Sequence, residues 1–129
     1  MRPLRPDHVT ILVGSLDRSM PYYDALLPLL GFKKSKPHIW ADGEGFFLQF
    51  QEARAGTSSY ERYGAGMNHI GFGAPNPQAV EDVRRGMADA GSETPEIQHL
   101  KGATALFLKD PDGIRFEVTH YPPGVDVVG

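Results

Sequence analysis

The chain has 129 residues, of which 40% are apolar and 22% charged, with a net charge of −3 and no cysteine. This length suits a single domain with one core, and the acidic balance argues against a nucleic-acid partner. The lack of cysteine excludes disulfides, thiolate metal sites and cysteine nucleophiles. No apolar run approaches the roughly 20 residues of a membrane span, and residues 1–6 have no apolar signal core. We therefore expect a soluble, cytoplasmic protein with no membrane partner.

The first half of the chain has the pattern of a strand, a helix and three more strands. Residues 8–13 alternate between polar and apolar side chains, which is typical of a half-buried strand. A helix is predicted to follow, with Asp17 as its N-cap and Gly31 as the residue just past its end. Its apolar face is formed by Met20, Tyr23, Leu27 and Leu30. Two short strands are predicted near residues 32–36 and 38–42, a turn at 42–45 and a strand at 46–51.

The same order of elements then recurs. Strands are predicted at 68–74, near 94–98, at 103–109 and at 114–121, with a helix at 77–90 after the first of them. Equivalent positions, such as His8 and His69, lie about 60 residues apart. The sequence thus predicts an α+β fold of two βαβββ modules related by a pseudo-twofold repeat. We expect one domain over 1–129, with module one at about 7–52, a linker at about 53–66, module two at about 67–121 and a tail at 122–129.

Four side chains with nitrogen or oxygen donors occupy equivalent places in the two halves. Aligning the last strands on their preceding glycines sets Gln49 against Glu117, and His8 is the counterpart of His69. All four lie on the strand face opposite the apolar one, and glycines share the face of His69 and leave room there. A polar face can also be merely solvated. Two imidazoles and one carboxylate, however, suit Fe(II), and such sets also bind Zn, Mn, Ni or Co. Gln49 either completes this metal site or only forms a hydrogen bond.

Several stretches resemble the vicinal oxygen chelate superfamily, which includes glyoxalase I, extradiol dioxygenases, fosfomycin-resistance transferases and bleomycin-binding proteins. The resemblance implies a curved mixed sheet with a cleft and with helices on its outer face. It also implies metal ligation by His8, His69 and Glu117, with Gln49 as fourth ligand. One divalent ion would hold the vicinal oxygens of a small substrate and stabilise an enediolate or oxyanion, in isomerase, lyase or dioxygenase chemistry. The matching stretches are Asp7-His8-Val9, Leu16-Asp17-Arg18-Ser19 through Leu30-Gly31-Phe32, Asn68-His69-Ile70-Gly71 and Asp110 through Glu117.

The resemblance also indicates which residues would meet the substrate. Gln49 and Glu117 are the predicted catalytic residues, and Thr10, Phe47, Phe107 and Arg115 are the predicted substrate-binding residues. Glyoxalase I anchors glutathione through Arg and Asn side chains at three positions. These positions hold Leu12, Ala53 and Ala65 in this chain, so glyoxalase I activity itself is disfavoured.

Two other classes of function stay open. One is a metal-free protein that binds a small molecule or antibiotic, as bleomycin-resistance proteins do, and the other is an interaction module with a vestigial cleft. We also expect a homodimer, because members of this superfamily often build the cleft between two chains. Residues 122–125 are predicted to form an extended arm that reaches the partner.

Overall fold

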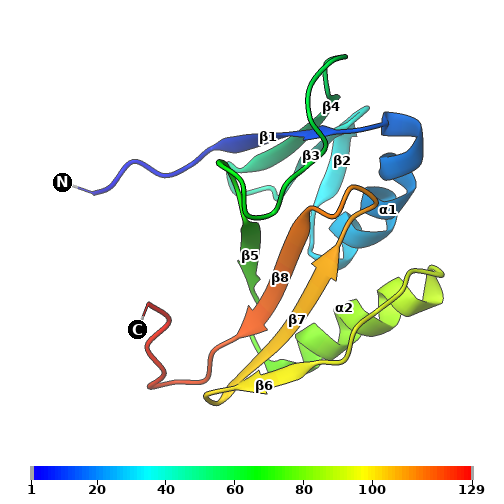
Figure 1. Cartoon of the computed structure of the whole chain (residues 1–129). Helices are drawn as coiled ribbons and strands as arrows, with labels where there is room; N and C mark the ends of the chain where they lie inside the picture. The colour runs from blue at the N-terminus through cyan, green and yellow to red at the C-terminus, as the bar shows by residue number, and fades with distance from the viewer. Residues whose placement is uncertain (1, 129) are drawn as a thin grey trace. The chain divides into compact units, whose positions relative to one another are not determined.

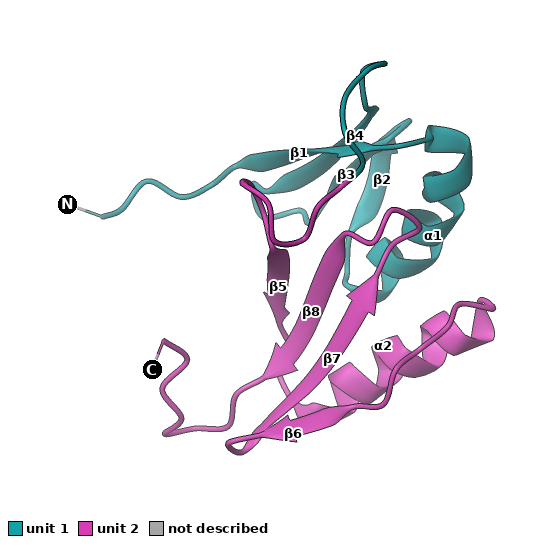
Figure 2. Cartoon of the chain, viewed as in Figure 1, with its two compact units in different colours: residues 1–59 teal, residues 60–129 magenta. Residues whose placement is uncertain are grey.

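A computed structural model describes residues 2–128. The chain divides into two compact units, residues 1–59 and 60–129 (Figure 2). Each unit contains one helix and one four-stranded mixed sheet (Figure 1). The predicted α+β fold of two βαβββ modules is thereby confirmed. Among the described residues, no helix is both long enough and apolar enough to cross a membrane.

Unit 1 contains β1 (His8–Val13), α1 (Leu16–Leu29), β2 (Lys33–Lys36), β3 (Ile39–Ala41) and β4 (Phe47–Glu52). The strand order is β1-β4-β3-β2, and β1 pairs with β4 in parallel while the other pairs are antiparallel. The parallel pair requires the chain to cross over between β1 and β4, and α1 lies within that connection.

The apolar side chains of unit 1 gather where α1 contacts β4. Val13 and Leu48 are fully buried on one sheet face, and Tyr23 of α1 packs on Phe50 with ring centroids 4.1 Å apart. Alternate residues of the same strands face the other way and stay at least partly exposed. The predicted division into an apolar and a polar face is therefore confirmed for this unit.

Trp40 lies in β3 and is 4% exposed. The Lys34 ammonium of β2 lies 5.6 Å from the centre of its ring, close enough for a cation–π contact. Lys34 also forms an ion pair with Asp24 of α1, with 3.4 Å between nitrogen and oxygen. The short edge strand β2, whose four residues are all exposed, is thus tied to both the helix and the next strand.

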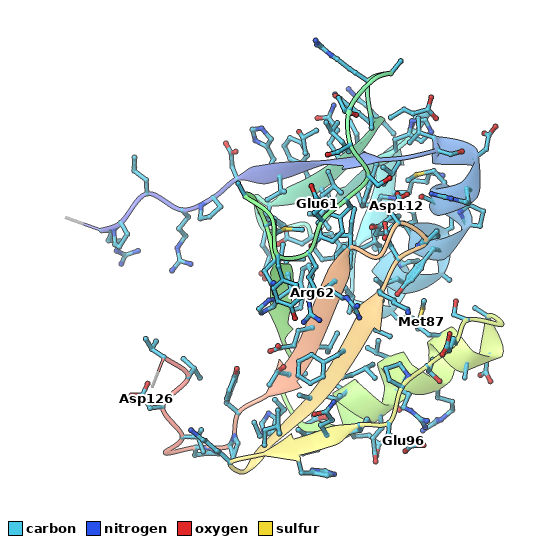
Figure 3. The ribbon with its side chains drawn as sticks, in the orientation of Figure 1. Glu61, Arg62, Met87, Glu96, Asp112 and Asp126 are labelled. Atoms are coloured by element: carbon cyan, nitrogen blue, oxygen red, sulfur yellow. The ribbon has the colours of Figure 1, made fainter. Side chains whose placement is uncertain are left out.

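Unit 2 repeats the order with β5 (His69–Gly73), α2 (Pro77–Asp89), β6 (Gln98–Leu100), β7 (Ala103–Lys109) and β8 (Arg115–His120). The strand order is β5-β8-β7-β6, again with one parallel pair, β5 with β8. α2 packs on β7 and β8. Figure 3 shows Met87 on this helix, where its side chain is fully buried together with Val80.

The N-termini of α1 and α2 can be compared with the predicted capping residues. α2 begins as predicted, because Asn76 Oδ1 accepts a hydrogen bond from Ala79 N at 2.8 Å. The predicted N-cap of α1 was wrong. Ser15, not Asp17, is the cap, and its Oγ accepts a hydrogen bond from Arg18 N at 3.2 Å. Asp17 lies in the first turn, where its negative charge still favours the helix N-terminus.

Two further local predictions were wrong. The strand expected near 94–98 begins only at Gln98, because Arg84 Nε of α2 donates a 2.8 Å hydrogen bond to the carbonyl of Pro95. The Pro95 carbonyl therefore accepts a hydrogen bond from a helix side chain and not from a neighbouring strand. Residues 122–125 do not form an extended arm: Val125 N donates to Pro122 O at 3.2 Å, and Gly124 has φ 86° in the resulting turn.

Candidate metal-binding site

In unit 2, His69 and Glu117 lie on the same face of two neighbouring strands. The register pairs His69 with Arg115 and Gly71 with Glu117, while Ile70 and Phe116 occupy the opposite face. A Cβ atom added to Gly71 would lie 4.0 Å from Glu117 Oε2. Because Gly71 has no side chain, the space above the carboxylate is left open.

His69 Nε2 and Glu117 Oε1 are 3.8 Å apart, and the two side chains are 48% and 20% exposed. An ion with ligand distances of about 2.1 Å holds two donors about 3.0 Å apart at a right angle and about 3.4 Å apart at the tetrahedral angle. Side-chain rotation that closes this gap by less than about 1 Å would bring both atoms into one coordination sphere. The distance between the two atoms is thus compatible with a shared cation after a small side-chain movement.

The other carboxylate oxygen of Glu117 is already engaged. Thr119 Oγ1 donates a 2.7 Å hydrogen bond to Glu117 Oε2, and Thr119 is only 4% exposed. This hydrogen bond restrains the carboxylate and leaves Oε1 as the oxygen nearer to His69. Glu117 was a predicted site residue, but Thr119 was not. Thr119 lies two residues later on the same strand face, and this spacing is the signal from which the hydrogen bond could have been predicted.

Each of the two histidines also has a neighbour that contacts its other ring nitrogen. Asn68 Oδ1 lies 2.8 Å from His69 Nδ1, and Asp7 Oδ1 lies 2.5 Å from His8 Nδ1. Asn68 and Asp7 were not among the predicted site residues. The available signal was that both histidines directly follow a residue with a side-chain oxygen. Such outer contacts orient histidines that ligate metals.

In unit 1, His8, Thr10, Phe47 and Gln49 share one face of β1 and β4. The register pairs His8 with Phe47 and Thr10 with Gln49. The rings of His8 and Phe47 are stacked, 4.9 Å between centroids and 8° between planes. Gln49 is half-buried, and within residues 2–128 its side chain has no hydrogen-bond partner. Its amide oxygen is therefore free to bind an ion or a substrate group.

The other predicted substrate-binding residues surround Glu117 in unit 2. Phe107 of β7 pairs directly with Glu117, on the side opposite Gly71. Arg115 lies between His69 and Lys109 in the register, and its Nε atom is buried without a partner in the described part of the chain. Arg115 and Lys109 thus share the sheet face of Glu117 and pair with each other two residues away along their strands.

The structure brings His69 and Glu117 together and places His8 on one face with Gln49. Within residues 2–128, no three His, Cys, Asp or Glu side chains form a group that could hold a metal ion. A site that joins all four predicted ligands therefore stays a prediction.

Comparison with known families decides the chain's affiliation. Residues 5–118 match the model of the Glyoxalase/Bleomycin resistance protein/Dioxygenase superfamily. The chain belongs to this superfamily. The resemblance found in the sequence is thereby confirmed, and the superfamily includes enzymes.

Two relatives of this superfamily are lactoylglutathione lyases. The enzyme of Haemophilus influenzae is 29% identical over 121 residues, which cover 85% of this chain and 87% of that protein. The GLX1 enzyme of Arabidopsis thaliana is 29% identical over 128 residues, but this chain spans only 44% of its length. The solved glyoxylase/bleomycin resistance protein/dioxygenase domain of Frankia sp. EAN1pec has a TM-score of 0.75 at 19% identity, covering 94% of this chain and all of that one. At that identity, the likeness shows the fold alone.

Proposed function

We propose that this chain is a divalent-metal-dependent enzyme of the glyoxalase/dioxygenase type, acting on a small substrate with vicinal oxygens. The observation that carries the proposal is the His69–Glu117 pair, whose Nε2 and Oε1 atoms lie 3.8 Å apart beside a glycine. His8 and Gln49, on one face of the other unit, are the proposed remaining ligands. A set of imidazole, carboxylate and amide donors suits Fe, Mn, Ni, Co or Zn.

When bound, such an ion would polarise the substrate's vicinal oxygens and stabilise negative charge that develops on them. The chain's own residues define the rest of the chemistry. Glu117 Oε1, which does not share the hydrogen bond from Thr119, is free to ligate or to accept a proton from substrate. Gln49 has two proposed roles, ligand or hydrogen-bond donor, because its amide carries both an oxygen and an NH₂ group.

The charges and rings around Glu117 indicate the kind of substrate. Arg115 and Lys109 pair across β8 and β7 on the sheet face of Glu117, and these two cationic side chains favour a substrate with an anionic group. Phe107 next to Glu117 and Phe47 on the face of His8 offer flat apolar surface. We infer a small oxygenated anion as substrate.

Glutathione conjugates fit this site less well, although the two relatives described above are lactoylglutathione lyases. Leu12 occupies one expected anchor position and is 52% exposed on β1, so an apolar side chain stands where an Arg would bind glutathione. Ala53 at a second position uses its N–H for a 2.8 Å hydrogen bond to Val13 O. We expect turnover of the glutathione–methylglyoxal hemithioacetal to stay at background, measured by absorbance of the thioester product. Efficient turnover would contradict this assignment.

Metal analysis of protein purified without an affinity tag tests the proposal. We expect about one divalent ion per chain in the wild type. The His69→Ala variant should lose it, while His99→Ala, a change of an exposed histidine in β6, should keep it. Wild type without stoichiometric metal would instead support the alternative, a metal-free small-molecule or antibiotic-binding protein.

Two remaining proposals concern the oligomeric state of the protein and the loss of ligand binding in histidine variants. We propose a homodimer, which light scattering coupled to gel filtration would show as twice the mass of the 14.2 kDa chain. We also expect that His8→Ala and His69→Ala abolish ligand binding. Unchanged ligand binding in both variants would favour an interaction module with a vestigial site.

A further inference from the structure

The side-chain amide of Asn68 is held in one orientation by its own contacts. Asn68 Nδ2 donates a 2.9 Å hydrogen bond to the carbonyl of Arg62, in the segment that precedes β5 (Figure 3). A carbonyl oxygen only accepts hydrogen bonds, so the NH₂ end of the amide must face Arg62. Tyr60 holds this segment in place, because its hydroxyl lies 2.8 Å from the carbonyls of both Met67 and Asn68.

The fixed amide determines which nitrogen of His69 carries the proton. With the NH₂ end turned to Arg62, the oxygen Oδ1 faces His69 Nδ1 at 2.8 Å. Because Oδ1 can only accept, Nδ1 must donate and therefore bears the hydrogen. A neutral imidazole has a single N–H, so Nε2 of His69 is left with its lone pair.

This tautomer keeps the pair with Glu117 open. Nε2 and Glu117 Oε1 then both present lone pairs, and their 3.8 Å separation is too long for a hydrogen bond. In the other tautomer, Nε2 would carry the hydrogen and could donate it to Oε1. The two side chains would then satisfy each other, and a cation would have to break that hydrogen bond before it could bind.

We propose that Asn68 is a positioning residue that sets the Nδ1–H tautomer of His69 in the metal-free protein. It thereby keeps Nε2 available toward Glu117. The value of this arrangement rests on the proposed metal-dependent function, but the tautomer itself is a property of the chain without metal. Asp7, next to His8, has an acceptor in the equivalent place of unit 1.

The tautomer can be measured by long-range ¹H–¹⁵N NMR of the histidine rings in chelator-treated protein at pH 8 to 9. The His69→Gln variant identifies the His69 signals. In the wild type we expect a protonated-type shift at Nδ1 and an unprotonated-type shift at Nε2. In Asn68→Ala, Nε2 should carry most of the hydrogen. Asn76→Ala, which removes the N-cap of α2 instead, is the matched control and should leave the ring unchanged.

Asn68→Asp separates this role from a purely structural one. An Asp at 68 still accepts from His69 Nδ1 but cannot donate to Arg62 O, so the tautomer should be retained. If Asn68 only tethers the Arg62 segment, Asn68→Asp and Asn68→Ala should act alike. That result, or a wild-type His69 with its hydrogen on Nε2, would overturn the proposal.

Titration with Ni(II) followed by calorimetry gives a second readout. Asn68→Ala should bind the ion about 10 to 100 times more weakly than wild type, as is typical when an outer contact of a ligating histidine is lost. Asn68→Asp and Asn76→Ala should stay within a few-fold of wild type. A wild type that binds no ion, with the NMR result as expected, would refute the proposed function and leave the tautomer assignment standing.

Discussion

Gly71 offers two substitutions, one that should raise stability and one that should weaken metal binding. It lies in β5 directly opposite Glu117, and its φ is outside the left-handed region. A Cβ at this position would meet Glu117 Oε2 at 4.0 Å, an ordinary van der Waals contact, and no other atom as close. Gly71→Ala therefore fits, and it should raise the free energy of unfolding by about 0.4 to 1 kcal/mol because the unfolded chain loses freedom.

A larger side chain at the same place should act differently. The branches of a leucine would reach past the Cβ and cover the Glu117 carboxylate, in the space that a cation shared with His69 would occupy. We expect Gly71→Leu to weaken metal binding at least about tenfold, or 1.4 kcal/mol. Gly73→Leu is the matched control, since it changes the same strand face where a Cβ would meet no atom within 4 Å.

Thermal denaturation and metal calorimetry check both effects. The stability gain of Gly71→Ala corresponds to a rise in Tm of about 1 to 4 °C. Its metal affinity should stay near that of wild type. A lower Tm for Gly71→Ala would contradict the predicted stability gain. Unchanged metal affinity in Gly71→Leu would refute the argument that this glycine keeps the carboxylate accessible.

Three further outcomes follow from contacts described above. Ser15→Ala should lower the stability of the protein by about 1 kcal/mol in urea denaturation, and more than Asp17→Ala, because Ser15 provides the N-cap hydrogen bond; equal losses would contradict this. Leu106→Ala should cost about 2 to 5 kcal/mol in the same assay, because Leu106 is fully buried in β7, and a loss below 1 kcal/mol would mean that the core of unit 2 is loosely packed. Arg115→Met should weaken the binding of oxalate, a small anion with vicinal oxygens, to the metal-loaded protein several-fold in calorimetry. The control Arg85→Met, on the exposed side of α2, should leave oxalate binding unchanged. Equal oxalate binding by the two variants would rule out Arg115 as an anion contact.

The parts of the fold that follow from side-chain periodicity were predictable. The strand and helix patterns recur with a spacing of about 60 residues, and the repeat alone indicated two βαβββ modules. It also set Gln49 against Glu117 and His8 against His69 on the polar strand faces, since residues on one strand face follow from counting by two. The register that pairs Gln49 with Thr10 and Glu117 with Gly71 became known only from the structure.

Predictions failed where a side chain competes with the local pattern. Ser15 and Asp17 are both good capping residues, and their order along the chain does not reveal which one adopts the extended backbone of a cap. The segment near 94–98 was predicted as a strand, but Arg84 from α2 binds its backbone at Pro95. That contact joins residues 11 positions apart in the sequence, which periodicity cannot anticipate.

The two hydrogen bonds near the site differ in how far the sequence could predict them. The bond from Thr119 to Glu117 joins two residues that are two positions apart in one strand, and this spacing is visible in the sequence. The bond from Asn68 to the Arg62 carbonyl depends on how an irregular segment turns back on β5. Main-chain carbonyls have no sequence signature, so this contact could not have been foreseen.

The placement of Trp40 gives this protein an intrinsic optical reporter. It is the chain's one tryptophan and is buried in β3 of unit 1, with the Lys34 ammonium beside its ring. Indole emission therefore follows the melting of residues 1–59 alone, whereas far-ultraviolet circular dichroism follows the backbone of both halves. Superimposed curves from the two signals would mean that the two units unfold as one cooperative system, and separated curves would mean that each unit unfolds independently of the other.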